Sequence, residues 1–63
     1  MQTLVAITVT LCADQAWAYA RFLKRVGLSD YAALARDQEE AYRMLQAGDA
    51  IREELRQAGY APR

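Results

Sequence analysis

The stretch VAITVTLCADQAW, residues 5–17, decides the expected fold of this chain. In residues 4–11 the odd positions are all large and apolar, and the even positions between them are alanine and threonine; the apolar row is Val5, Ile7, Val9 and Leu11. Alternation with period two, rich in β-branched residues, predicts an amphipathic β-strand with its odd face toward a core or a partner. A helix is expected directly after it, capped by Cys12 or Asp14, with Gln15 in the capping-box position after Cys12.

Two main helices are expected after the strand. In the first, apolar residues recur at three- and four-residue spacing from Ala16 to Val26, and Gly27 is placed to end the helix. A short helix in the connection would be capped by Ser29 or Asp30.

The second main helix has clear boundaries. Asp37 and Glu40 have capping-box spacing, and Gly59 is placed to end the helix. Its apolar stripe includes Gly48, and a glycine inside a helix, which costs about 1 kcal/mol relative to alanine, indicates close approach of another element.

The sequence therefore predicts an α+β fold, one β-strand followed by two main α-helices (β-α-α), in a single domain over residues 1–63. A lone strand leaves unpaired backbone groups, so we expect it to pair across a homodimer whose interface holds Val5, Ile7, Val9 and Leu11. The alternatives are a second strand near residues 30–35, or an edge that is open for a target.

Composition narrows the possible classes of protein. The 63 residues include one cysteine and no histidine, so neither an internal disulfide nor a Cys/His zinc site is expected. Eight basic and eight acidic residues balance to a net charge of zero, which argues against a polyanion binder held by bulk electrostatics. The uncharged residues 1–13 lack a basic signal region and are too few to span a bilayer, so a cytoplasmic protein with no membrane contact is expected.

The chemistry predicts a protein that is not an enzyme and has no cofactor and no metal. The single cysteine has no visible base, and adjacent glutamates on a helix point about 100° apart. The aromatic and acidic residues predict a protein-binding surface instead, because tyrosines are typical binding anchors and carboxylates suit a basic partner. The candidate partner-binding residues are Tyr31, Tyr42, Asp30, Asp37, Glu39 and Glu40.

The segment ITVTLCADQAWAYARFLKRVGLS resembles the strand, first helix and turn of the ribbon-helix-helix family. That resemblance implies a dimeric DNA-binding repressor or antitoxin whose strand residues Ala6, Thr8 and Thr10 would read bases. The preferred base readers are Arg, Lys, Asn and Gln, and no basic residue precedes Arg21, so DNA is the alternative rather than the expected partner.

The whole chain resembles a family of short uncharacterised proteins of proteobacterial genomes and prophages, through DQAWAYARFLKRVGLSDY, EEAYRMLQAGDAIREEL and AGYAPR. In size and character it is similar to the anti-CRISPR inhibitors. The resemblance implies a cytoplasmic protein of a mobile element in a bacterial host. The expected function is non-enzymatic inhibition by binding a host protein complex, with a CRISPR surveillance complex as the candidate; a structural accessory protein of a phage is a third possibility.

Overall fold

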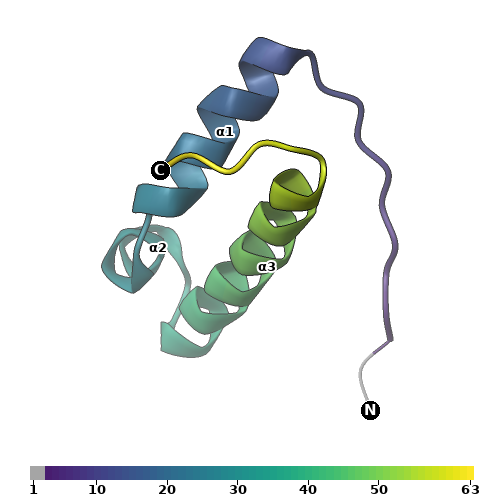
Figure 1. Ribbon diagram of the computed structural model, residues 1–63. Coiled ribbons are helices and arrows are strands. Elements are labelled where there is room, and N and C mark those ends of the chain that lie inside the picture. Colours follow the sequence, from purple (N-terminus) through teal and green to yellow (C-terminus); the bar gives the residue numbers. More distant parts are fainter. Residues whose placement is uncertain (1–2) are drawn as a thin grey trace.

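The computed structural model describes residues 3–63, and all regular secondary structure in that range is helical (Figure 1). Helix α1 spans Ala13–Arg25, α2 spans Leu28–Leu34 and α3 spans Gln38–Gln57. Both α1 and α2 pack against α3, which is therefore the central element of the bundle. Residues 3–11 form an extended arm that runs along the side of the molecule nearest to α3 (Figure 1).

The predicted α+β fold is wrong, because residues 3–63 contain no β-strand. The backbone predicted as a strand is extended in the arm, but a strand also needs a second extended segment about 4.8 Å away to share its hydrogen bonds. Residues 30–35, the alternative pairing segment, lie instead in α2 and at its C-cap Ala35. The β-α-α order with a strand paired across a dimer is therefore replaced by an all-α bundle with an N-terminal arm.

The start of α1 is as the sequence predicts. The Gln15 side chain accepts a hydrogen bond from the Cys12 backbone N–H at 3.0 Å, which confirms the expected pair.

The corner between α1 and α2 differs from the sequence prediction. Helix α1 ends at Arg25, and Gly27 is the N-cap of α2 rather than the residue that ends α1. The Asp30 carboxylate accepts from the Gly27 N–H at 2.9 Å, so α2 begins as soon as α1 has ended.

Helix α3 begins with half of the predicted capping box. The Asp37 carboxylate accepts from the Glu40 N–H at 2.8 Å, as expected. The Glu40 carboxylate accepts from the N–H of Arg36 at 3.0 Å, one residue before the cap, and not from Asp37. The return half of the box is thus displaced by one residue toward the N-terminus.

The predicted end of α3 at Gly59 is confirmed. Gly59 has a φ of +101°, in the region that side-chain-bearing residues rarely adopt. Its N–H bonds to the Arg56 carbonyl at 3.0 Å, and the Tyr60 N–H bonds to the Leu55 carbonyl at 2.8 Å, the two bonds of a Schellman motif. This turn brings Tyr60 against Trp17 of α1, edge to face with ring centroids 5.0 Å apart.

The hydrophobic core is small and rich in alanine. Its buried members are Ala16, Ala20, Leu23 and Leu55, with Val26 and Tyr60 packed against them. Alanine lets helices approach closely but buries little apolar area, so each contact contributes modestly to stability. Much of the large apolar surface of the chain lies outside this core.

Gly48 lies where all three helices meet, which confirms the predicted close approach. It is buried on α3, and a Cβ atom built on it would collide with the Tyr31 hydroxyl of α2. The same Cβ would lie 3.5 Å from Cδ2 of Leu23 on α1. A side chain here would have to displace Tyr31.

Candidate protein-binding surfaces

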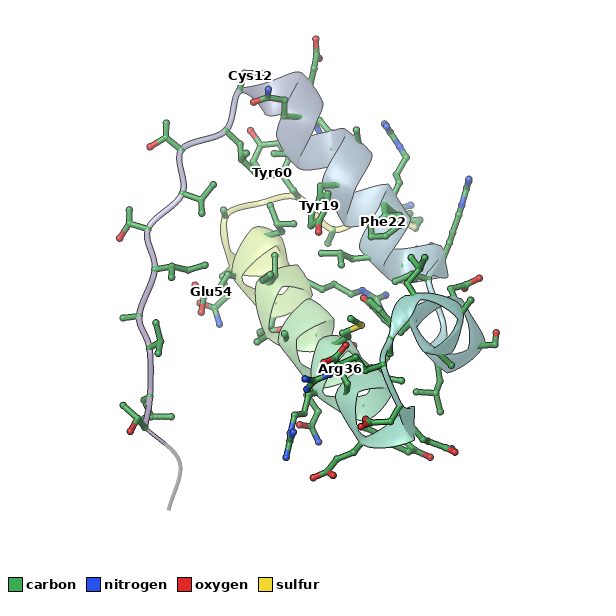
Figure 2. All side chains as sticks on the ribbon, turned by 180° about the vertical axis from the view of Figure 1, so that it is seen from behind. Cys12, Tyr19, Phe22, Arg36, Glu54 and Tyr60 are labelled. Carbon is green, nitrogen blue, oxygen red and sulfur yellow. The ribbon has the colours of Figure 1, made fainter. Side chains whose placement is uncertain are left out.

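The arm and the helical bundle enclose an apolar groove, here called the arm groove, with a volume of about 1030 Å³. In Figure 2, Glu54 points from α3 toward the arm; it is the one ionisable carboxylate in the lining. One wall is the arm and the other belongs to α1 and α3. The lining residues are Val5, Ala6, Ile7, Val9 and Leu11 of the arm, Gln15, Ala18 and Tyr19 of α1, and Ala50, Ile51, Glu54 and Leu55 of α3.

The apolar row predicted as a dimer interface lies in the arm wall of this groove and is largely uncovered. The exposed fractions fall along the arm: Val5 80%, Ile7 71%, Val9 64% and Leu11 42%. On the helical wall, Tyr19 is 45% and Ile51 38% exposed. Monomeric proteins rarely leave large apolar side chains uncovered in one continuous stretch, so this groove is a candidate contact surface.

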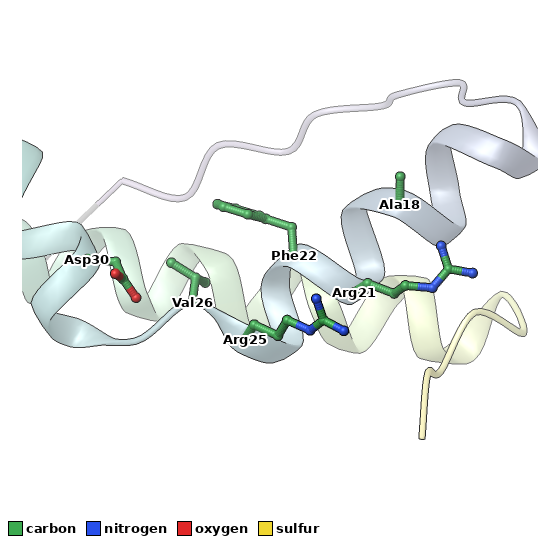
Figure 3. A pocket seen from close by; sticks show the side chains of 6 residues that line it. All are labelled: Ala18, Arg21, Phe22, Arg25, Val26 and Asp30. Atoms are coloured by element: carbon green, nitrogen blue, oxygen red, sulfur yellow. The ribbon is translucent and has the colours of Figure 1, made fainter.

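A second hollow lies on the outer face of α1 and at the start of α2, and is here called the arginine hollow (Figure 3). It has a volume of about 510 Å³ and is lined by Ala18, Arg21, Phe22, Arg25, Val26 and Asp30. Arg21 and Arg25 are one helical turn apart, and the Phe22 side chain next to them is 48% exposed.

Side chains around the arginine hollow pack against neighbouring aromatic rings. The ring centroids of Phe22 and Tyr19 are 5.3 Å apart, and the Arg21 guanidinium lies 5.8 Å from the centroid of the Trp17 ring. None of the ion pairs found in residues 3–63 includes Arg21 or Arg25. Their charges are therefore not neutralised by a carboxylate in the described part of the chain.

The two tyrosines predicted to bind a partner have different environments. Tyr31 is half-buried between α2 and α3, against Gly48. Burial raises the pKa of Tyr31, with smaller contributions from Tyr19 and Asp49, so the hydroxyl is held in its neutral form. Tyr42 is 46% exposed on α3 and offers more of its surface to a partner.

The four carboxylates predicted to bind a partner all have partners within the chain. Asp30 and Asp37 accept backbone N–H groups at the starts of α2 and α3. Glu39 and Glu40 pair with arginines one turn away, which are Arg43 at 2.6 Å and Arg36 at 2.9 Å. The Glu39–Arg43 pair is exposed and so contributes little to stability, whereas Glu40 is half-buried; both pairs reduce the negative potential that a basic partner would meet.

The sequence analysis did not predict the arginine hollow. The signal was present, because Arg21 and Arg25 have i,i+4 spacing around Phe22 and no acidic residue follows within α1. Asp30, which sequence reasoning selected, does line the hollow.

The described residues provide no group of three or more His, Cys, Asp or Glu side chains that could hold a metal ion. Cys12 is exposed at the N-cap of α1. No helix within residues 3–63 combines the length and apolar character that a membrane span requires.

Comparison with known proteins shows a relationship at the level of a family. The model of a family of unknown function, DUF7706, matches residues 1–63. No curated protein and no solved structure matches the chain significantly.

Proposed function

The chain belongs to DUF7706, a family of unknown function, and we propose that it is a non-enzymatic protein that inhibits a host assembly by binding its surface. The observation that carries this proposal is the arginine hollow, in which exposed Phe22 lies beside two arginines without a carboxylate partner in the described residues. Binding by such a surface requires shape and charge alone, with no reacting group.

The composition of the hollow matches that of a protein-binding hot spot. Arginine and large aromatic residues dominate such sites, because a guanidinium forms bidentate hydrogen bonds with carboxylates and a ring buries a large apolar area. The matching partner surface presents a carboxylate next to an apolar side chain. Asp30, at the edge of the hollow, would repel a second carboxylate there and so restricts its orientation.

We propose a CRISPR surveillance complex as the host assembly. The support is the resemblance in size and character to the small inhibitors of mobile elements, together with a docking surface that this chain offers. An inhibitor of this kind would cover a surface that the complex needs for its target or its nuclease.

The experiment measures rescue of a CRISPR-targeted phage in a bacterium that expresses this protein. We expect the wild type to restore plaque formation and to bind the purified complex. Phe22→Ala should weaken binding by roughly 30-fold or more, as truncation of a hot-spot anchor does. Arg25→Glu should abolish rescue. Arg52→Glu, the same charge change on an exposed residue of α3, should leave rescue intact.

Two outcomes would contradict the proposal in different ways. Absence of rescue and of binding across the tested interference systems would remove the CRISPR target. Full rescue by both Phe22→Ala and Arg25→Glu would show that the inhibitor binds through another surface.

DNA binding is the second candidate, and the same cations favour it. Arg21, Lys24 and Arg25 all lie in the second half of α1, and none of them takes part in an ion pair in residues 3–63. The ribbon-helix-helix mode of binding relies on a strand, so DNA would have to be contacted through α1. Fluorescence anisotropy with duplex DNA separates the candidates, because binding through phosphates weakens steeply between about 50 and 200 mM salt.

A further inference from the structure

The arm groove is a binding site for a particular kind of segment. Its helical wall presents apolar side chains of α1 and α3, so an occupant that lies against this wall must be apolar on the side that faces it. The arm, residues 3–11, carries no charged side chain at all. A second arm, with its apolar row on one face, therefore matches the helical wall.

We propose that a second copy of this chain fills the groove, each copy placing the apolar row of its arm against the α1–α3 wall of the other. The contact is made by arm side chains on helices. Val5, Ile7 and Val9 of one copy meet Tyr19 and Ile51 of the other, and two-fold symmetry repeats the contact in the second groove. This inference goes beyond the proposed function, because it uses a different surface from the arginine hollow.

Charge favours a second copy as the occupant. The single carboxylate in the lining, Glu54, would meet an uncharged arm, so no like charges are brought together. The net charge of the chain is zero, and two copies therefore approach without long-range repulsion. A strongly acidic segment would be repelled by Glu54. In a strongly basic segment one cation could pair with Glu54, but the other cations would lie against apolar walls.

The uncovered area is sufficient for a dimer. Six of the large apolar side chains of the two walls are between 38% and 80% exposed. At side-chain areas of the usual size this amounts to roughly 600 Å² per copy, or about 1,200 Å² in total, the lower limit of a specific stable interface. The alanine-rich core gives a further reason, because a chain of this length commonly needs a partner to bury enough apolar surface.

The first experiment measures the mass in solution by light scattering over a concentration series. We expect twice the chain mass of 7.1 kDa for the wild type. Ile7→Asp in the arm wall and Ile51→Asp in the helical wall should each give the single-chain mass. Thr8→Asp, next to Ile7 in the arm but outside the groove lining, is the matched control and should remain dimeric. Circular dichroism checks that helicity is unchanged, and Ile7→Asp lies outside the helices and so leaves their folding intact.

A second experiment identifies which chain provides the arm. In a Cys12→Ser background, Val9→Cys in one chain and Ala50→Cys in another are mixed under oxidising conditions. We expect the mixed disulfide between the two different chains. A wild type that keeps the single-chain mass at millimolar concentration overturns the proposal. A dimer that survives both Ile7→Asp and Ile51→Asp also overturns it. So does a double variant, with Val9→Cys and Ala50→Cys in the same chain, that forms its disulfide only within that chain while the two single variants form none with each other.

Discussion

Substitution of Gly48 by alanine tests the packing at the point where the three helices meet. The new Cβ would collide with the Tyr31 hydroxyl, whereas the next nearest atoms, Cζ of Tyr31 and Cδ2 of Leu23, would lie at 3.4 and 3.5 Å. The hydroxyl is thus the principal obstacle. The hydroxyl is fixed to a rigid ring, so the collision can be removed only by rotating the whole Tyr31 side chain or by shifting α2.

Two opposing free energies decide the sign of the effect. Alanine in place of glycine inside a helix stabilises by about 1 kcal/mol. Overpacking of a close contact destabilises by about 1–3 kcal/mol. We expect the second to exceed the first, so that Gly48→Ala lowers the free energy of unfolding by about 1 kcal/mol. For a domain of this size that lowers the midpoint of thermal unfolding by about 4–8 °C.

The matched background is Tyr31→Phe, which removes the obstructing hydroxyl and keeps the ring. The remaining contacts of an alanine at Gly48 are then near ordinary van der Waals distance. We expect Gly48→Ala to stabilise this background by up to about 1 kcal/mol. The assay is urea unfolding followed by far-ultraviolet circular dichroism for the four members of a double-mutant cycle.

The cycle predicts a coupling free energy of about 2 kcal/mol between the two positions. If Gly48→Ala stabilises the wild type as much as it stabilises Tyr31→Phe, the coupling is zero. That result would refute the contact between Tyr31 and Gly48 and the account of why a glycine lies in the apolar stripe of α3.

Substitutions at three further positions test local features of the fold. Gly59→Ala should destabilise by about 1–2 kcal/mol in urea unfolding, since its φ of +101° is strained for alanine, while Gly59→Asn should cost clearly less; equal costs would contradict the strain argument. Asp37→Ala should cost about 1 kcal/mol by removing the 2.8 Å cap on the Glu40 N–H, and Asp37→Ser should retain most of the stability. Hydrogen bonds from Arg56 lower the pKa of Glu53 from 4.5 to about 2, so its stabilising contribution is present above pH 4.5 and is lost as the pH falls toward 2. Glu53→Gln should flatten that part of the stability–pH curve, and an unchanged curve would show that the exposed pair is screened by solvent.

The helices were predictable because their signals are local. Hydrogen-bonding groups three residues apart define the starts of α1 and α3, and a glycine with positive φ defines the end of α3. The role of Gly27 was not predictable in the same way. A glycine after a cationic turn fits both a helix end and a helix start, and the choice depends on Asp30 reaching back to its N–H.

The predicted strand failed for a different reason. The alternation of residues 4–11 correctly indicates an extended backbone, because β-branched residues such as Val5, Ile7 and Val9 disfavour a helix. A strand, however, is a property of two segments, and its partner is not encoded in the pattern of one. The sequence therefore predicted the conformation of the arm and its apolar row, but not its environment.

The candidate surfaces show the same division between local and global information. Glu39 and Glu40 looked available because sequence shows charge, whereas their pairing with Arg43 and Arg36 is visible only in three dimensions. Phe22 lies within the apolar pattern from Ala16 to Val26, yet it is 48% exposed, because the small alanine-rich core covers only one side of α1. The apolar residues that such a core cannot cover are the ones left for other molecules. Among residues 3–63 most of them lie in two places, the arm groove with its single carboxylate, Glu54, and the arginine hollow, and this difference in charge suits the two surfaces to different partners.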